Sequence, residues 1–127
     1  MIKIDAIVRE DKMQDVQDAL KELRIQGMTI SQVMGCGASL GYTQRVRAST
    51  VDVSLVPKVK FEIVVSSMKW AEKAIDAIST VAKTGEHGDG KIFIYEIKDA
   101  VRIRTGERGK HALYDVQQLL EEEDDEE

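Results

Sequence analysis

The length, composition and charge of the chain exclude several classes of protein. It has 127 residues, of which 43% are hydrophobic and 32% charged, and this suits one globular domain. No apolar run approaches the roughly 20 residues that a membrane-spanning helix needs. The opening residues MIKIDAIVRE alternate polar and apolar side chains, unlike the continuous apolar block of a signal peptide. We therefore expect a cytoplasmic protein that does not insert into a membrane.

The formal net charge of −5 is concentrated at the C-terminal end. Residues 121–127, EEEDDEE, are all acidic, and without them residues 1–120 carry a net charge of +2. We expect a single domain over 1–120 and an acidic, disordered tail after it. With no dominant basic face and only 5% aromatic residues, the domain is not expected to bind nucleic acid. The single cysteine, Cys36, excludes an intrachain disulfide, and two histidines are too few for a structural zinc site.

The first third of the chain has the periodicity of a strand, a helix and a second strand. Apolar residues at every second position over 2–8 predict a strand. Apolar residues at intervals of three and four over 12–25 predict an amphipathic helix, which we expect Gly27 to end. Residues 28–34 then predict the second strand.

The rest of the chain begins with a segment of a different kind. Residues 35–56 show no sustained period and predict a long loop, and loops of this length in compact domains usually have a function. Alternation resumes over 59–63, which predicts a strand, and helical spacing follows over 68–83. Residues 91–99 predict a fourth strand, and apolar positions over 113–120 a short C-terminal helix.

This order of elements, βαβ, loop, βαβ, predicts an α+β fold of the ferredoxin-like type, with both helices on one face of an antiparallel sheet. The other face should then carry the alternate residues of the strands, which we expect to be apolar at Ile7, Val64 and Ile94. An apolar sheet face is seldom left open to water, so we expect self-association to cover it.

Glycines and cations cluster at both ends of the fourth predicted strand. Gly88, Gly90 and Lys91 precede it, and Arg102 and Arg104 follow it. Glycines let backbone N–H groups approach an anion, and lysine and arginine supply the positive charge that a polyphosphate needs. Two arginines two residues apart in an extended segment point the same way, whereas the two clusters lie a strand length apart. A phosphate site shared between subunits is therefore implied.

Other interpretations of this stretch remain open. The glycines could simply end the preceding helix, and Arg102 and Arg104 could pair with Glu107 or Asp99. A P-loop NTPase is disfavoured, because Ile92 follows the lysine where that motif requires serine or threonine.

Five segments together resemble the PII nitrogen-regulatory signal proteins, in register over nearly the whole of residues 1–113. The resemblance is carried by TGEHGDGKIFI, VRIRTGERG, MIKIDAIVRE, GMTISQVMGCG and VPKVKFEIVV. It implies a homotrimer of ferredoxin-like subunits that binds ATP or ADP in the clefts between subunits. Many members also sense 2-oxoglutarate, and the long T-loop, here about residues 37–56, docks onto target proteins.

The resemblance also implies roles for individual positions. The phosphates would be held by the predicted loop and the two arginines: Gly88, Asp89, Gly90, Lys91, Arg102 and Arg104. The adenine would be surrounded by residues of three strands: Ile7, Thr29, Glu62, Ile63 and Val64. The chain would pass near the ribose and phosphates at Gly35, Gly37 and Ala38.

Departures from the family pattern fall in the T-loop. Ser39 replaces the glutamine that completes the Mg²⁺ shell and helps to seat 2-oxoglutarate, and a hydroxyl is the weaker ligand, so Mg²⁺ and 2-oxoglutarate are doubtful here. Lys58, which pairs with the distal carboxylate of that acid in relatives, is present. Val51 replaces the tyrosine that many relatives have uridylylated, and Ser49 matches a serine that is phosphorylated in some.

We interpret the protein as a regulator and not an enzyme. The family implies an ammonium-transporter type of membrane partner, contacted through Tyr42, Arg45 and Arg47, and a metabolic enzyme is the alternative target. A rival hypothesis is an adenylate-energy sensor that does not bind 2-oxoglutarate and acts outside ammonium assimilation. A second rival is a small phosphoryl-transfer or acylphosphatase-like enzyme, for which only Asp89, Glu62 or Glu107 could activate water.

Overall fold

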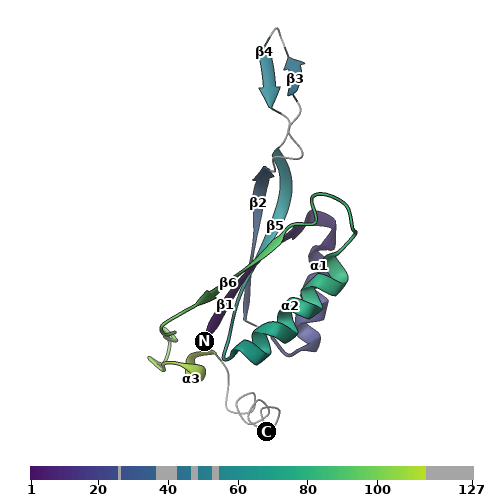
Figure 1. The fold of residues 1–127 in the computed structure, drawn as a ribbon. Coiled ribbons are helices and arrows are strands. Elements are labelled where there is room, and N and C mark those ends of the chain that lie inside the picture. The colour runs from purple at the N-terminus through teal and green to yellow at the C-terminus, as the bar shows by residue number, and fades with distance from the viewer. Residues whose placement is uncertain (26, 37–42, 47–48, 53–54, 114–127) are drawn as a thin grey trace.

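A computed structural model describes residues 1–25, 27–36, 43–46, 49–52 and 55–113, with the two short central stretches described as backbone. Four strands form one antiparallel sheet in the order β2-β5-β1-β6 (Figure 1). They are β1 (Ile2–Arg9), β2 (Met28–Cys36), β5 (Leu55–Val65) and β6 (Lys91–Glu96). The helices are the 3₁₀ turn η1 (Glu10–Lys12), α1 (Met13–Glu22), α2 (Met68–Ala82) and the short α3 (Lys110–Leu113).

Both long helices lie on the same face of the sheet, as the ferredoxin-like prediction requires (Figure 1). Every second residue of β1 and β5 points into the layer between sheet and helices, as the strand period dictates. Ile4 and Phe61 are fully buried there, against Leu20 of α1 and Ile78 of α2. Burial of such side chains stabilises the fold by about 1.5–3 kcal/mol each, so this layer holds the sheet and helices together. The predicted fold class is confirmed.

Helix α1 ends earlier than predicted, and Gly27 does not end it. The helix stops at Glu22, and Arg24 takes the left-handed conformation, with φ 64°. The Arg24 N–H donates to the Lys21 carbonyl at 2.8 Å, and the Ile25 N–H donates to the Leu20 carbonyl at 3.0 Å. This pair of bonds is the Schellman type of helix end, whose left-handed position glycine usually fills. An arginine there gives no sequence signal for a stop.

The long connection predicted after the second strand is found between β2 and β5, with slightly narrower bounds than expected. Strand β2 continues to Cys36, which pairs with Leu55, where β5 begins. Between them, β3 (Thr43–Val46) and β4 (Ser49–Asp52) pair as a small separate sheet. The two short strands gave no sequence signal, because four residues are too few to show a period, although Thr and Val favour strands. Strand β6 also ends sooner, at Glu96, and the predicted helix over 113–120 lies almost wholly outside the described residues.

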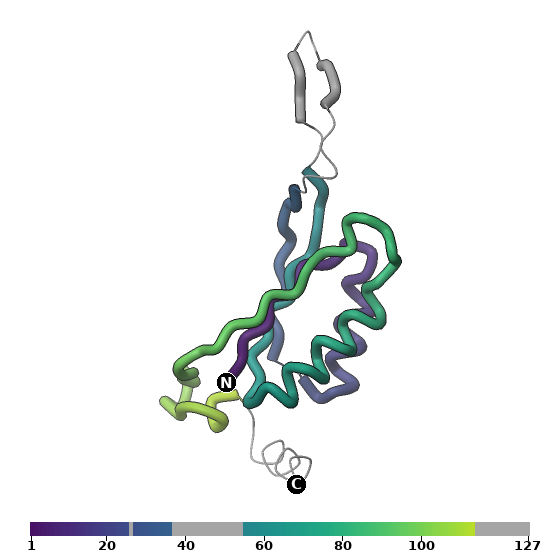
Figure 2. Tube along the Cα trace, viewed as in Figure 1, coloured from purple at the N-terminus to yellow at the C-terminus, as the bar shows by residue number. Residues whose placement is uncertain are grey.

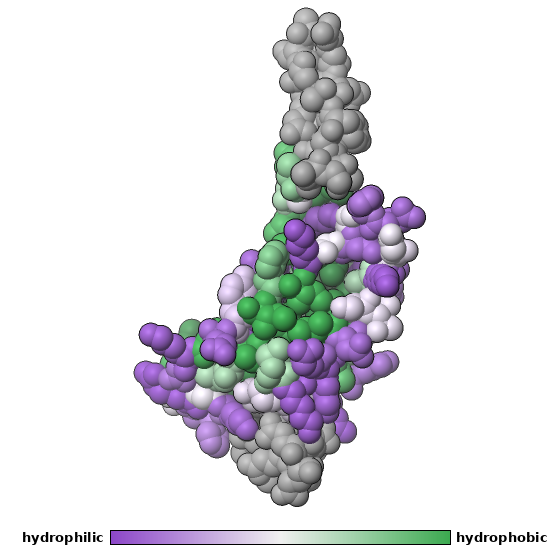
Figure 3. Space-filling model, in the orientation of Figure 1, coloured by the Kyte–Doolittle hydropathy of each residue, from purple (hydrophilic) through white to green (hydrophobic). Residues whose placement is uncertain are grey.

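The open face of the sheet, which the helices do not cover, is more polar than predicted. Ile7 and Val64 lie on it, as expected. However, Ile94 pairs with Ile4 and therefore faces the helix side. It is exposed because β6 is an edge strand, and Figure 3 shows apolar residues gathered between this strand and α2. The expectation that Ile94 lies on the open face was therefore wrong, because neighbouring positions of a strand face opposite sides of the sheet. Within the described parts of the chain, no helix is both long and apolar enough to span a membrane.

Candidate anion-binding site

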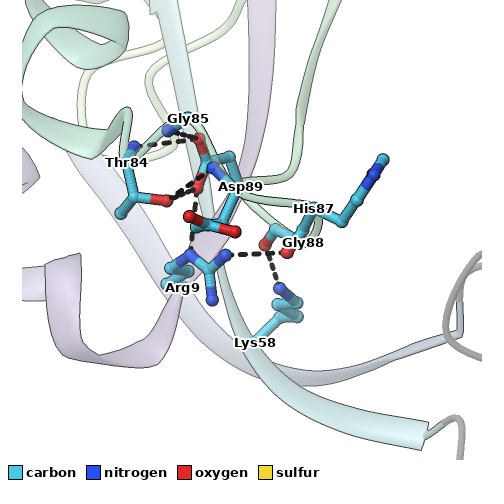
Figure 4. Close-up of polar contacts among 8 residues, drawn as sticks. Arg9, Lys58, Thr84, Gly85, His87, Gly88 and Asp89 are labelled. Carbon is cyan, nitrogen blue, oxygen red and sulfur yellow. Dashed lines mark hydrogen bonds and ion pairs between the residues drawn. The ribbon is translucent and has the colours of Figure 1, made fainter.

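Residues 84–90, here called the glycine loop, connect α2 to β6 and reach back to the ends of β1 and β5 (Figure 4). Gly90 has φ 100°, and a Cβ at this position would lie 1.7 Å from the Ile7 carbonyl oxygen. Only glycine permits both the positive φ and this close approach to β1. Gly90 therefore does more than follow the end of a helix, because it allows the loop to pack directly against β1.

Asp89 ties the loop together from within. Its carboxylate accepts hydrogen bonds from the Thr84 and Gly85 backbone N–H groups, both at 2.9 Å, and from the Thr84 hydroxyl. Arg9 of β1 donates to the same carboxylate from Nε at 3.0 Å. These bonds, those from Thr84 first, hold the pKa of Asp89 well below its ordinary value of 3.8. The Asp89 carboxylate is therefore ionised at neutral pH, and its oxygens accept hydrogen bonds from the loop and from Arg9.

Two cations hold two successive carbonyl groups of the loop. The Arg9 guanidinium donates to the His87 carbonyl oxygen at 2.8 Å, and the Lys58 ammonium donates to the Gly88 carbonyl oxygen. Each peptide unit is planar and trans, so the N–H on its far side points the opposite way. The Gly88 and Asp89 N–H groups are thereby turned away from Arg9 and Lys58. Successive backbone N–H groups that face the same side are a recurrent way of binding an anion in proteins.

Lys58 is part of this arrangement and not a plain surface lysine at the start of a strand. It is directly opposite Arg9 in the β1–β5 pairing and is only 7% exposed. Burial, and secondarily the Arg9 charge, lower the pKa of Lys58 from its ordinary value. Gly35 packs beside it, with the position of a Cβ 3.0 Å from Lys58 Cγ. A bulkier residue at 35 would therefore press on this lysine.

The segment that carries Arg102 and Arg104 follows the other end of β6 (Figure 2). Residues 102–107, here called the arginine turn, are not extended, because the Arg102 N–H donates to the Glu107 carbonyl at 2.9 Å and the Gly106 N–H to the Arg102 carbonyl at 2.7 Å. The expectation that both guanidinium groups point the same way in an extended segment therefore has no basis. Arg102 pairs with Glu107 at 3.4 Å, whereas Asp99 pairs with Arg108 at 2.8 Å. Within one chain, Lys91 and the arginine turn are separated by the length of β6, as predicted.

The residues expected around an adenine lie on the sheet. Thr29 of β2 pairs directly with Glu62 of β5. By the same register, Ile7 and Val64 share the open face with them. Ile63 instead points into the core and is 2% exposed, so it can offer only its backbone to a ligand on the open face.

A charged cluster in the middle of the open face was missed from the sequence. Asp5, 4% exposed, lies between Lys3 at 3.4 Å and Lys60 at 3.7 Å, and the same lysines contact Glu62 at 3.2 and 3.7 Å. The Glu62 contact, most of all, raises the pKa of Lys3, and Asp5 raises the pKa of Tyr95. Glu62 is therefore neither alone nor fully solvated, because two lysines compensate its charge.

Several predicted positions lie outside the described residues or are described as backbone only. Gly37, Ala38, Ser39, Tyr42 and Arg47 fall among the former, and so does the acidic tail over 121–127. The backbones of Arg45, Ser49 and Val51 belong to β3 and β4.

Sequence reasoning missed Arg9 and Thr84 as members of the site. Arg9 is 80 residues from Asp89 in the chain, and only the pairing of β1 with its neighbours brings it to the loop. Thr84 follows the end of α2 and gives no periodic signal. One sequence signal could have pointed to Arg9. It lies two residues after Ile7, so in a strand its side chain is on the same face, which the predicted site shares.

Comparison of the sequence with known proteins identifies one family. The sequence model described as nitrogen regulatory protein P-II matches residues 1–107. Nitrogen regulatory protein P-II 1 of Methanothermobacter thermautotrophicus is 49% identical over 113 residues, which are 89% of this chain and 97% of that protein. The P-II protein of Rhodospirillum rubrum is 45% identical over 113 residues, covering 89% and 100% of the two chains. That of Rhizobium etli is 46% identical over 108 residues, covering 85% and 96%. The matched region includes the sheet, both long helices and the glycine loop.

Proposed function

Because the chain belongs to the nitrogen regulatory protein P-II family, we propose that it is a nitrogen-regulation signalling protein that binds ATP or ADP through the glycine loop and controls a target protein. The observation that carries this proposal is the pair of N–H groups of Gly88 and Asp89, turned outward because Arg9 and Lys58 hold the opposite carbonyls. Lys91 follows directly on the open face. Amides and a flexible cation together suit the phosphates of a nucleotide.

In the proposal the nucleotide site is shared between subunits of a homotrimer. The arginine turn cannot reach the glycine loop of its own chain along β6, so Arg102 and Arg104 act on a phosphate bound by a neighbouring copy. Thr29, Glu62 and Val64 would line the adenine side, where an apolar slot with a few polar contacts is needed. Burial of Phe93 and Tyr95, which are 44% and 45% exposed in the single chain, favours such an assembly.

A regulatory role fits the acidic residues better than the rival enzyme does. A general base that works near neutral pH needs a raised carboxylate pKa, whereas that of Asp89 is lowered. Glu62 is ion-paired with Lys3 and Lys60, and Glu107 with Arg102. ATP and ADP therefore act as ligands, with Mg²⁺ accompanying the nucleotide, and the output is conformational.

The target is reached through the segment between β2 and β5. A ligand shifts the conformation of this segment only as far as it binds two conformations unequally, so the γ-phosphate must meet a contact that ADP lacks. Lys91, Arg102 and Arg104 supply candidates for that contact. The proposed target is a membrane transporter, of the ammonium-transporter type, or an enzyme of nitrogen metabolism. The alternative is an adenylate-energy sensor that does not bind 2-oxoglutarate. The presence of Ser39 where the family has glutamine favours this alternative.

Calorimetric titration of ATP with Mg²⁺, with and without 2-oxoglutarate, tests the function. Binding of ATP supports the nucleotide site, and tighter binding with 2-oxoglutarate identifies a sensor of carbon and nitrogen together. Equal binding in both conditions identifies the energy sensor. Arg102→Ala should weaken ATP binding about tenfold or more, because a charge-assisted contact is lost. Failure of the folded wild-type protein to bind either nucleotide would refute the proposal.

A further inference from the structure

We propose that Thr84, Asp89 and Arg9 are positioning residues that fix the glycine loop in its anion-binding shape without touching the anion themselves. The inference rests on the proposed nucleotide-binding function and assigns to these side chains a role that differs from contact with phosphate. Its basis is the closed set of hydrogen bonds in Figure 4, in which all three side chains face one another and the loop backbone.

Thr84 is the centre of this set. Its hydroxyl donates to Asp89 Oδ1 and accepts from the Glu86 N–H at 3.1 Å, while its own backbone N–H donates to Asp89 Oδ2 at 2.9 Å. A hydroxyl that both donates and accepts is fixed in one rotamer. The start of the loop is thereby joined to its far side, five residues on.

The Asp89 carboxylate is turned toward the protein and away from a ligand. Both of its oxygens accept bonds from Thr84, and Gly85 and Arg9 add one bond each. A carboxylate aimed at phosphate would repel it, so an inward orientation is the one compatible with an anion site. The backbone of Asp89 then contributes its N–H to the anion while its side chain holds the turn.

Arg9 joins the loop to the sheet. Its guanidinium contacts the Asp89 carboxylate at 3.0 Å and the His87 carbonyl at 2.8 Å, so one planar group fixes two points of the loop. A lysine could supply the charge but not this two-point contact. The position of the Gly88 N–H relative to β1 is therefore set by Arg9.

Substitution of Thr84 in the full-length protein tests the inference. Thr84→Val keeps the size of the side chain but removes both hydroxyl bonds, whereas Thr84→Ser retains both. Thr80→Val is the matched control, because the Thr80 hydroxyl donates to the Asp76 carbonyl of α2 at 2.7 Å, away from the glycine loop. ATP and inorganic triphosphate are titrated into each variant, and melting temperatures are recorded. We expect Thr84→Val to bind both ligands about five- to tenfold more weakly, and Thr84→Ser and Thr80→Val to stay within about twofold of wild type.

The outcomes separate this inference from the proposed function. If wild type binds ATP and Thr84→Val binds it equally well, the positioning role is wrong and the nucleotide site stands. If Thr84→Ser is as weak as Thr84→Val, the hydroxyl is not the cause and the inference also fails. Should Thr84→Val unfold, Arg9→Lys serves instead: it keeps the charge, loses the two-point contact, and should bind triphosphate about fivefold more weakly at an unchanged melting temperature.

Discussion

The glycine loop and the arginine turn both carry the groups that a phosphate needs, but they are built differently. The glycine loop is fastened to the sheet, through Gly90 against Ile7 and through Arg9 to Asp89. The arginine turn is closed mainly on itself, and its Arg102–Glu107 pair has side chains 27% and 45% exposed. Ile103 between the two arginines is 100% exposed. Within the described residues, one half of the proposed site is therefore held against the sheet, whereas two backbone hydrogen bonds of the other half lie within the turn.

This difference indicates how ligand and assembly could be coupled. In the proposed function, a preformed half site would lose little conformational entropy when a phosphate binds, so it would determine where the nucleotide sits. In the proposed function, a turn that is closed on itself and exposed can shift when a ligand and a second copy meet it, so it would respond to which nucleotide is present. Substitutions in the glycine loop should therefore affect stability more than matched substitutions in the arginine turn.

The largest effect is expected from alanine in place of the glycine that contacts the sheet. In Gly90→Ala the new Cβ would meet the Ile7 carbonyl, and we expect a loss of about 3–5 kcal/mol in the free energy of unfolding. Gly106→Ala in the arginine turn is the matched control, because φ is 75° but, among the described residues, no atom beyond its chain neighbours lies within 4 Å of the Cβ position. It should cost only about 1–2 kcal/mol. Urea unfolding measures both, and equal losses would remove the distinction between the regions.

Removal of the Asp89 charge should change how stability depends on pH. The folded-state pKa of Asp89 is lowered, so its contribution is complete above the unfolded value near 3.8 and is lost as pH falls through the folded-state pKa. Asp89→Asn should therefore be less stable than wild type at pH 6, with a difference that shrinks below about pH 4. Asp99→Asn is the counterpart near the arginine turn, where Arg108 chiefly lowers the pKa of Asp99.

We expect the Asp99→Asn difference to be the smaller of the two, because the side chain of Asp99 is 39% exposed and that of Asp89 is 24% exposed. Urea unfolding at pH 6, 4 and 3 gives both differences. A constant gap between wild type and Asp89→Asn across this range would contradict the lowered pKa.

The smallest effect is expected in the arginine turn itself. Glu107→Gln removes an exposed ion pair with Arg102, so the free energy of unfolding should change by less than about 0.5 kcal/mol. The same change removes a carboxylate that competes with phosphate for the guanidinium, so ATP should bind about two- to threefold more tightly. Thermal unfolding and ATP titration check the two parts, and a large loss of stability would show that the turn is as firmly built as the glycine loop.

Much of the fold could be predicted because its layers follow simple periods. The alternation in β1 and the helical spacing in α2 located those elements to within a residue or two. The glycines and the lysine that stand together before a strand could also be read, and phosphate binding by this loop stays a prediction. Local patterns sufficed wherever a single period or a short motif carried the information.

The remaining features depend on tertiary contacts or on unusual residues. Arg24 ends α1 in a conformation that glycine usually takes, so no stop signal appears at that point. Arg9 joins the loop only through strand pairing across 80 residues. Ile94 was assigned to the wrong face because register decides the face and a single strand does not reveal its register.

The most direct test of the account is complementation between two defective chains. Lys91→Ala removes the cation beside the glycine loop, and Arg102→Ala removes one from the arginine turn; each variant alone should bind ATP weakly. Mixed assemblies, made by coexpression with two different affinity tags and purified on both, should regain wild-type affinity at some sites, because one cleft then has an intact half from each chain. If the mixed assemblies bind ATP no better than either variant alone, the two halves do not meet across subunits and the central claim is wrong.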